Sequence, residues 1–452
     1  MYECTMYEGC TKEEKSLNLG DFSLFSCIYA KKAVPLHPQR FEQMNWSFLI
    51  DNKDALNVTT DSRKVSPGCI FVALKGEHFD GNDFVEQAKA QGAAYVISGE
   101  NALAELQDLA RAWRRQLGIP IIGITGTNGK TTTKELTAAV LSTKYKIYYT
   151  QGNLNNQLGV PLTLLSMTRA HELAIVEMGA SHPGDIQELV EIAEPTCGLI
   201  TNVGRAHLQG FGSFEGVQAT KRELYDFLVA HNGTIFRNAD NPYLEKMYLS
   251  ACEASGLSGV AGLSSISKAV LYHTGTMPSD THLVGGYNAE NVSAAICVGR
   301  YFGVSEEAAL AAIRAYVPSN NRSQLMQSEH NTVVVDAYNA NPTSMQAAIE
   351  AFDKGQRDKV QSTKDAYILG AMRELGEYSH LEHQNIVNML LERKADKVLL
   401  VGNEYQETTA PYPVFENVEA LCEHLRQEPL QGYRILLKGS RSNQLEKVIP
   451  LL

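Results

Sequence analysis

The sequence lacks both a metal-binding cysteine pattern and a hydrophobic run long enough to cross a membrane. Its eight cysteines include no C-x-x-C pair and no cysteine–histidine cluster, so neither a zinc site nor a disulfide framework is predicted. We expect reduced, mostly buried thiols, as in a reducing compartment. No apolar run approaches the ~20 residues of a transmembrane helix. These absences predict a cytoplasmic protein without membrane insertion.

Positive charge is also scarce. The chain has 40 lysines and arginines against 51 aspartates and glutamates, a formal net charge of -11 at pH 7. Because proteins bind nucleic acid largely by neutralising phosphates with cations, this balance argues against broad nucleic-acid binding. A small anionic ligand needs only local positive charge, so the sequence leaves that class of ligand open.

The chain of 452 residues is long enough for about three domains, at ~150 residues each. Residues 1–43 show no clean period and lack the basic start and apolar core of a secretion signal, so we expect them to be an N-terminal extension. Three α/β domains are expected over residues 44–118, 119–317 and 318–452. No internal repeat or low-complexity tract is seen.

Short apolar runs separated by helical patterns predict the strands. They lie at residues 69–74, 93–97, 119–124, 173–176, 198–200, 234–236, 332–335, 366–369, 397–401 and 434–437. Such alternation predicts parallel sheets covered by helices on both faces, with a doubly wound, Rossmann-like third domain. A helical period predicts a helix over residues 288–301, with Asn288 and Asn291 on one side of its first turn.

A glycine loop between a strand and a helix is the most specific motif. The apolar run ending at Ile124 leads into Thr125-Gly126-Thr127-Asn128-Gly129-Lys130-Thr131-Thr132, and a helical pattern follows. Backbone N–H groups of such a loop close around phosphate oxygens, aided by the helix N-terminus. Lys130 can reach the β- and γ-phosphates and Thr131 can bind Mg²⁺. The common G-x-x-x-x-G-K-[ST] pattern would need glycine at position 124, so the loop indicates an ATP-using family other than the common GTPases and kinases.

Three further polar residues follow or lie near the central strands. Glu177 ends an apolar run, where a carboxylate points into the ligand crevice and can hold Mg²⁺; a solvated strand-end glutamate is the alternative. His207 has no partner that its spacing reveals, so its role stays open. Lys221 has the pattern of an ordinary charged helix face.

Two polar turns follow strands of the third domain. Asp336, at the end of one strand, can accept hydrogen bonds from ribose hydroxyls, and it leads into Asn339-Ala340-Asn341-Pro342; a simple turn is the alternative. Lys438-Gly439-Ser440-Arg441 suits a carboxylate or phosphate, and the alternative is a solvated basic loop.

Taken together, these segments resemble the Mur ligase family of peptidoglycan synthesis over nearly all of residues 57–452. The motifs that carry the resemblance are Asp61-Ser62-Arg63, the phosphate loop, Asn153 to Pro161, Glu177-Met178-Gly179-Ala180, Ala206-His207-Leu208, Tyr338-Asn339-Ala340-Asn341-Pro342 and Lys438-Gly439-Ser440-Arg441. They are most similar to the branch that adds D-alanyl-D-alanine. The D-N-P-R motif of the branch that adds the third residue is absent.

The resemblance implies an ADP-forming amide ligase of the bacterial cytoplasm, acting as a monomer. It would join D-alanyl-D-alanine to UDP-N-acetylmuramoyl-tripeptide through an acyl phosphate. The first domain would bind the UDP-sugar, the central P-loop domain ATP, and the third would complete the ligase. Two alternatives remain: another ligase of this type, either the third-residue-adding enzyme or a folylpolyglutamate synthetase, and a nucleotide-binding module without ligation.

The resemblance also implies roles for individual residues. The catalytic set would be Lys130, Glu177, His207 and Lys221. Two Mg²⁺ ions are expected, held by Thr131, Glu177, His207 and Lys221, the last as a carbamate. ATP would be bound by Gly126, Thr127, Asn128, Gly129, Lys130, Thr131, Thr132, Asn288, Asn291, Arg322 and Asp336. The substrates would contact Ser62, Arg63, Asn155, Asn156, Asn339, Asn341, Lys438, Ser440 and Arg441.

Two positions depart from the pattern of the family. The adenine segment usually reads G-x-H-N, but Tyr287 stands here in place of the histidine. The usual G-R at the start of the third domain is replaced by Asn321-Arg322-Ser323.

Overall fold

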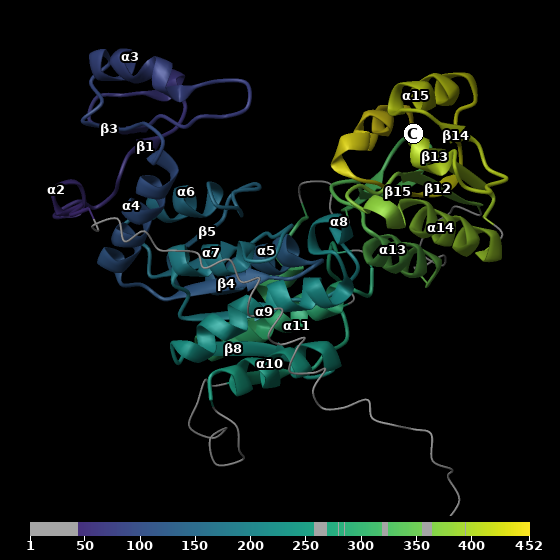
Figure 1. Cartoon of the computed structure of the whole chain (residues 1–452). Helices are drawn as coiled ribbons and strands as arrows, with labels where there is room; N and C mark the ends of the chain where they lie inside the picture. Colours follow the sequence, from purple (N-terminus) through teal and green to yellow (C-terminus); the bar gives the residue numbers. More distant parts are fainter. Residues whose placement is uncertain are drawn as a thin grey trace, which may run out of the picture. The chain divides into compact units, whose positions relative to one another are not determined.

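The computed structural model describes residues 44–256, 269–278, 280–283, 285–318, 324–354, 364–393 and 395–452. Within these residues, Trp46–Leu452 form one compact unit that contains three β-sheets, one of three strands and two of six (Figure 1). The predicted α/β fold class is confirmed. The expected N-terminal extension over residues 1–43 and the expected phosphate ligand Arg322 lie outside the described residues.

The first sheet is small and parallel. Its strands run in the order β1 (Val58–Thr59), β2 (Ile70–Val72) and β3 (Tyr95–Ile97). The helices around it are α2 (Ser47–Ile50), η1 (Ser62–Lys64), η2 (Gly81–Phe84), α3 (Val85–Ala90) and α4 (Ala102–Leu117).

Helix α4 connects this sheet to the central domain. Its residues Leu106, Leu109, Ala110 and Trp113 are buried at the spacing of one helical face. They belong to the same hydrophobic cluster as residues of β2 and β3 and residues of the central sheet. The first two domains therefore share a core.

The central sheet is entirely parallel. Its strands run in the order β5 (Ile147–Tyr149), β6 (Leu173–Glu177), β4 (Ile121–Thr125), β7 (Cys197–Ile200), β8 (Thr234–Asn238) and β9 (Ala269–Tyr272). Its helices are α5 (Lys130–Leu141), α6 (Gly159–Leu165), α7 (Asp185–Ala193), α8 (Leu208–Phe211), α9 (Phe214–Ala230), α10 (Pro242–Ala254), α11 (Asn288–Tyr301) and α12 (Glu306–Ala315).

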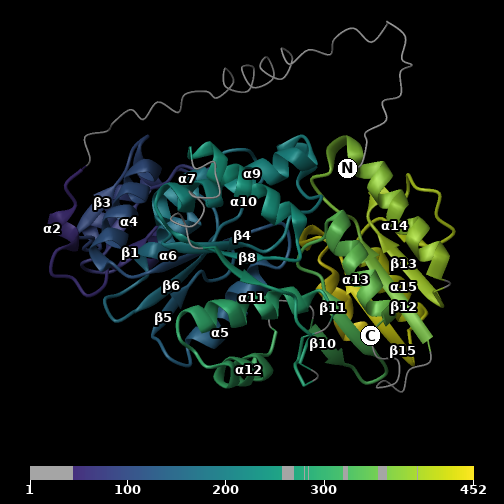
Figure 2. The same cartoon turned by 90° about the horizontal axis from the view of Figure 1, so that it is seen from below.

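Helices cover both faces of the central sheet. Neighbouring residues of β4 point to opposite faces, so Ile121 packs with α7, α9 and α10, whereas Ile122 and Ile124 pack with α5, α11 and α12. Figure 2 shows these two helical layers on either side of the strands. The carboxyl ends of the strands are left open between the layers, where ligands bind in sheets of this kind.

The third sheet is mixed. Its strands run in the order β10 (Gln324–Gln327), β11 (Thr332–Asp336), β15 (Tyr433–Lys438), β12 (Lys364–Gly370), β13 (Lys397–Val401) and β14 (Val414–Phe415), with only β10 antiparallel to its neighbour. Helices α13 (Pro342–Lys354) and α14 (Ser379–Arg393) cover one face, and α15 (Val418–Gln427) and η7 (Leu445–Leu451) cover the other. The short helices η4 (Gly376–Tyr378), η5 (Asn403–Tyr405) and η6 (Arg441–Asn443) lie in its loops. The sheet is doubly wound, as predicted.

The sequence predicted the central strands and missed five others. The predicted helix over residues 288–301 is confirmed as α11. The strands that were not predicted are β1, β5, β9, β10 and β14, and all of them lie at sheet edges. These edge strands are short or only partly buried: β1 and β14 have 2 residues each, and β9 and β10 include exposed positions, so their signal is weaker than that of a long buried strand.

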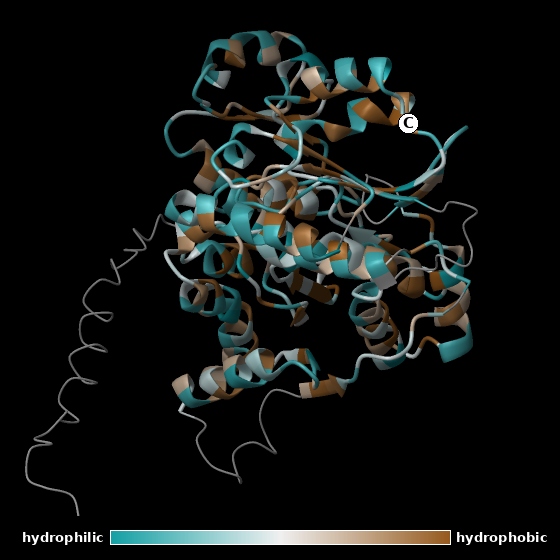
Figure 3. Cartoon of the chain, turned by 90° about the vertical axis from the view of Figure 1, so that its right-hand side faces the viewer, coloured by the Kyte–Doolittle hydropathy of each residue, from teal (hydrophilic) through white to brown (hydrophobic). Residues whose placement is uncertain are grey.

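The helices carry both hydrophobic and hydrophilic residues along their length (Figure 3), as expected for helices with one face on a sheet. In the described part of the chain, none of them combines the length and the apolar character of a membrane span.

The core shared by the first two domains gives a test of the fold. Trp113 is fully buried, and its indole N–H donates to the Met167 carbonyl oxygen at 3.1 Å. We expect Trp113→Ala to lower the free energy of unfolding by about 3–5 kcal/mol, measured by denaturant unfolding and circular dichroism. The control is Leu381→Ala, because Leu381 is 54% exposed. This substitution should change the free energy of unfolding by less than about 0.5 kcal/mol. Equal losses in both variants would contradict this role of α4.

Candidate nucleotide and metal site

The glycine loop lies between β4 and α5 and has no room for side chains at its two glycines. Gly126 and Gly129 have φ values of +142° and +78°. A Cβ atom at Gly126 would lie 2.0 Å from the Thr201 hydroxyl oxygen, and one at Gly129 would lie 2.4 Å from Asn291 Oδ1. Any larger residue at either of these two positions would therefore collide with its neighbours.

The N-terminus of α5 can bind an anion. No side chain caps its N-terminus at Gly129, so backbone N–H groups of the first turn need an acceptor. Lys130 Nζ donates to the carbonyl oxygens of Gly126 and Thr127 at 2.8 and 2.9 Å, which places the ammonium across the loop. A phosphate group can accept from both the amides and this lysine.

A cleft of about 810 Å³ opens beside the loop. This volume is in the range of nucleotide-sized ligand sites. The cleft gathers fifteen of the residues predicted from the sequence, namely Thr127, Asn128, Gly129, Lys130, Thr131, Thr132, Asn155, Asn156, Glu177, His207, Asn288, Asn291, Asp336, Asn339 and Lys438. The central and third domains both contribute to it.

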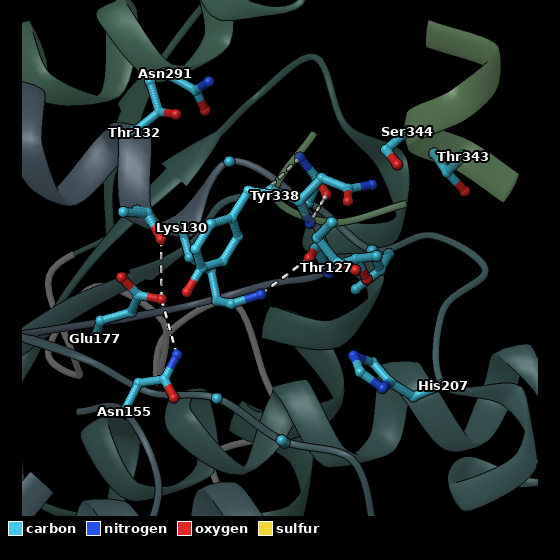
Figure 4. A pocket seen from close by; sticks show the side chains of 18 of the residues that line it. Thr127, Lys130, Thr132, Asn155, Glu177, His207, Asn291, Tyr338, Thr343 and Ser344 are labelled. Atoms are coloured by element: carbon cyan, nitrogen blue, oxygen red, sulfur yellow. Dashed lines mark hydrogen bonds between the residues drawn. The ribbon is translucent and has the colours of Figure 1, made fainter. Parts of the chain in front are cut away.

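Glu177 ends β6 and is only 2% exposed, so it is not a solvated strand-end glutamate. Its Oε1 accepts hydrogen bonds from the Thr131 hydroxyl at 3.2 Å and the Asn155 amide at 3.0 Å. Figure 4 shows Asn155 and Glu177 facing one another. Its Oε2 has no hydrogen-bond partner among the described residues.

A magnesium ion fits this pair of oxygens. The buried, unsatisfied Oε2 atom, together with the Thr131 hydroxyl, offers the hard oxygen ligands that Mg²⁺ prefers. Within the described ranges, no three His, Cys, Asp or Glu side chains form a ready-made metal cluster. Further ligands would therefore come from phosphate oxygens, water or a modified side chain.

His207 lies at the edge of the cleft in a left-handed backbone conformation, with φ +49°. Its Nδ1 is hydrogen-bonded to Glu374 of the third domain, and the backbone N–H of Gln209 donates to the Glu374 carbonyl oxygen at 3.3 Å. Burial lowers the pKa of His207, and the Glu374 carboxylate opposes this effect. The neutral imidazole so favoured is the form that can ligate a metal.

The interpretation of Lys221 as an ordinary charged helix residue is wrong. Its residue exposure is 2%, and its Nζ lies 5.4 Å from the centre of the Phe211 ring. Burial, followed by the positive charge of Lys130, lowers the pKa of Lys221 well below its ordinary value. The helical pattern of α9 did not reveal this, because α8 covers the lysine from outside its own helix.

Asn288 and Asn291 lie together, as their spacing predicted. The Asn291 amide donates to Asn288 Oδ1 at 2.9 Å, and Asn291 Oδ1 accepts from the Thr133 hydroxyl at 2.9 Å. These bonds join the start of α11 to the start of α5 and place both asparagines beside the phosphate loop.

The third domain contributes a buried ion pair. Lys438 is 1% exposed, and its Nζ lies 2.6 Å from Asp336 Oδ2 and donates to the Asn339 carbonyl oxygen at 3.1 Å. Lys438 is therefore not part of a solvated basic loop. The Asn341 amide donates to Asn128 Oδ1 at 2.8 Å, which links this domain to the phosphate loop.

Among the described residues, the predicted ones that do not line the cleft are Ser62, Arg63, Gly126, Lys221, Asn341, Ser440 and Arg441. Arg63 lies in the first domain, where its guanidinium donates two hydrogen bonds to the Asp61 carboxylate, both at 2.9 Å. The Ser440 hydroxyl is buried without a hydrogen-bond partner among the described residues.

Asn202 and Glu374 are among the cleft residues that sequence reasoning missed. Asn202 Oδ1 accepts from the backbone N–H of Asn128 at 3.0 Å, and its position just after β7 was a signal that could have been used. Glu374 follows β12 in a loop of the third domain, and no local pattern connects it with His207.

Comparison with known proteins identifies the family of this chain. The Mur ligase family, catalytic domain, matches residues 56–141; the Mur ligase middle domain matches residues 124–299; and the Mur ligase, glutamate ligase domain, matches residues 321–441. The UDP-N-acetylmuramoyl-tripeptide--D-alanyl-D-alanine ligase of Bacillus subtilis is 32% identical over 432 residues, covering 87% of this chain and 92% of the relative. The chain belongs to the Mur ligase family.

Two more Mur ligases are similar over most of their length. The UDP-N-acetylmuramoyl-tripeptide--D-alanyl-D-alanine ligase of Escherichia coli is 34% identical over 427 residues, covering 87% of this chain and 93% of the relative. The crystal structure of MurF ligase from Thermotoga maritima in complex with ADP has a TM-score of 0.75 and 26% identity, covering 88% of this chain and 97% of that one. The resemblance to the Mur ligase family and the prediction of an ATP-dependent ligase are confirmed.

In this Mur ligase, the closeness of Gly129 to Asn291 predicts that a single methyl group added at position 129 affects nucleotide binding. We expect Gly129→Ala to weaken nucleotide binding at least about tenfold, because the left-handed backbone is strained and the new Cβ would collide with Asn291 Oδ1. Fluorescence titration with a fluorescent ATP analogue measures the affinity.

Gly118→Ala is the matched control for this prediction. Gly118 also has a positive φ, +65°, but nothing lies within 4 Å of an added Cβ. Its substitution should leave nucleotide affinity unchanged. Equal weakening in both variants would show that the contact with Asn291 is unimportant.

Proposed function

We propose that this protein joins D-alanyl-D-alanine to UDP-N-acetylmuramoyl-tripeptide, forming an amide bond and converting ATP to ADP and phosphate. The observation that carries the proposal is the shared cleft. Phosphate-loop residues of the central domain and polar residues of the third domain line the same cavity. Relatives 32–34% identical over most of the chain carry the name of this activity.

The reaction requires that a carboxylate become a good acyl donor. One oxygen of the tripeptide carboxylate attacks the γ-phosphorus, ADP leaves, and an acyl phosphate forms. The unprotonated amine of D-alanyl-D-alanine then attacks the acyl carbon. Phosphate leaves from the tetrahedral intermediate, the amine proton is released, and the amide remains. In both steps negative charge must be stabilised at the phosphate groups.

The phosphate loop supplies much of that stabilisation. Lys130, which lies across the loop on the Gly126 and Thr127 carbonyl oxygens, would turn its ammonium to the γ-phosphate oxygens. Thr131 and Glu177 would hold one Mg²⁺ and His207 would help hold a second. These ions would neutralise charge on the phosphates. The third-domain residues that contact the loop would help to exclude water from the acyl phosphate.

Lys221 is proposed to become a carbamate. Its buried amine has a strongly lowered pKa, and an unprotonated amine is the form that adds CO₂. The carbamate would be an anion with two oxygens, in effect a long carboxylate, and it would join the metal site. Burial and the nearby charge of Lys130 favour the uncharged amine, against the weaker attraction of Asp185 and Glu223.

The remaining roles are assigned by domain. Each of the three sheets falls within one of the ranges 44–118, 119–317 and 318–452, which supports these as the domains for the UDP-sugar, for ATP and for completing the ligase site. The proposed substrate contacts are Ser62 and Arg63 in the first, Asn155 and Asn156 in the second, and Asn339, Asn341, Lys438, Ser440 and Arg441 in the third. Asn288 and Asn291 would face adenine, Asp336 the ribose and Arg322 the phosphates. We propose a cytoplasmic monomer.

A two-substrate assay tests the function. Purified protein with ATP and Mg²⁺ should release phosphate only when both UDP-N-acetylmuramoyl-tripeptide and D-alanyl-D-alanine are present, and the amide product should appear in equal amount. Lys130→Ala should reduce turnover at least about a hundredfold, because charge on the transferred phosphoryl group is left unbalanced. Lys146→Ala, at an exposed lysine of the same domain, is the control. Phosphate release without the dipeptide, or product with a different amine instead, would contradict the proposal.

A rescue experiment tests the carbamate. Lys221→Ala should abolish turnover, and added short carboxylates such as acetate should restore part of it by taking the place of the lost oxygens. Lys246→Ala, an exposed lysine of α10, should behave as wild type. Full activity of Lys221→Ala without added carboxylate would show that the carbamate is not needed.

A further inference from the structure

One buried lysine next to the phosphate loop has no part in the reaction as described. Lys134 lies one turn after Lys130 on α5 and is 1% exposed. Lysines are seldom buried to this degree, because removing an ammonium from water is costly unless it is paired. Its position therefore calls for a partner of opposite charge.

The partners of Lys134 lie around the carboxylate of Glu177. Lys134 Nζ donates to the Thr150 carbonyl oxygen at 2.8 Å, lies 3.7 Å from Glu177 Oε2, and lies 3.9 Å from Glu135 Oε1. Glu177 is itself 2% exposed. The two buried charges therefore balance one another.

No other cation in the described part of the chain lies within 4 Å of the Glu177 carboxylate. Its hydrogen bonds from Thr131 and Asn155 come from neutral groups and reach only Oε1. The Oε2 atom, which has no hydrogen bond, is the one that faces Lys134. Removal of the lysine would leave a buried carboxylate without a compensating charge.

Thr150 adds a second connection between the two residues. The backbone N–H of Glu177 donates to the Thr150 hydroxyl at 3.0 Å, and the Thr150 carbonyl oxygen accepts from Lys134. Lys134 thus holds both the carboxylate group of Glu177 and the segment that supports its backbone.

We propose that Lys134 is a positioning residue that holds the Glu177 carboxylate in place for the metal ion by balancing its charge. This inference rests on the proposed function, in which Glu177 binds Mg²⁺. Residues behind a metal ligand commonly change metal affinity by about tenfold to a hundredfold when they are lost.

The alternative is that Lys134 only fills space. A second cavity of about 440 Å³, lined by Lys134, Glu135, Tyr149 and Thr150 among others, lies beside it. This room allows a larger arginine at position 134. Arginine would keep the charge while changing the shape, whereas methionine would keep the length and remove the charge.

The experiment compares Lys134→Met and Lys134→Arg in the full-length protein. The probe is Mn²⁺ in place of Mg²⁺, titrated into the complex of each protein with ADP and followed by electron paramagnetic resonance. Thermal unfolding shows whether each variant is folded, and Lys146→Met is the control at an exposed lysine. We expect Lys134→Met to weaken Mn²⁺ binding at least about tenfold and Lys134→Arg to weaken it less than about threefold. In the ligase assay, high Mg²⁺ should restore much of the kcat of Lys134→Met.

Other outcomes would overturn the inference. Unchanged or tighter Mn²⁺ binding by Lys134→Met would show that the lysine does not support Glu177. Equal weakening in the methionine and arginine variants would assign Lys134 a packing role only. Failure of the proposed function appears separately, because wild-type protein would then give no amide product, whereas the binding comparison among variants requires no ligation.

Discussion

The parallel pairing of β4 with β6 is the constraint on which the site depends. It places Ile124 opposite Glu177, so the phosphate loop begins beside the carboxylate that ends the neighbouring strand. A shift of the β4–β6 pairing by one residue would move the Glu177 side chain to the opposite face of the sheet, which helices cover. On the other side of β4, strand β7 leads to Asn202. The backbone carbonyl oxygen of Asn202 accepts a hydrogen bond from the backbone N–H of Thr127 at 2.9 Å and so fixes the phosphate loop from that side.

Buried lysines surround this edge of the sheet. Lys134, Lys221 and Lys438 are each at most 2% exposed, although burial of an ammonium is costly. Lys134 faces the Glu177 carboxylate and Lys438 pairs with Asp336, whereas burial strongly lowers the pKa of Lys221 and so favours its uncharged amine. An acidic chain can still bind anionic substrates, because local positive charge such as that of Lys130 across the phosphate loop is enough.

Much of this arrangement could be predicted because its signals are local. A strand, two glycines, a lysine, a threonine and a helix follow one another within a few residues, and the amide pair of Asn288 and Asn291 is set by helical spacing. The misses have physical causes. The edge strands β5, β9, β10 and β14 are short or only partly buried, so their pattern is weak. The pattern of α9 did not reveal that Lys221 is buried, because the ring that covers it, Phe211, belongs to another helix.

By itself, the sequence determined the strand–loop–helix order of the phosphate site, the buried strands of each sheet and the family, since these depend on neighbouring residues and on motifs. Only the tertiary structure decided which groups face each other across the cleft. The contact of His207 with Glu374, the bond between Asn128 and Asn341, and the burial of Lys134 behind Glu177 all join residues from different elements. Their distances are set by sheet register and by the packing of domains, which no local pattern encodes.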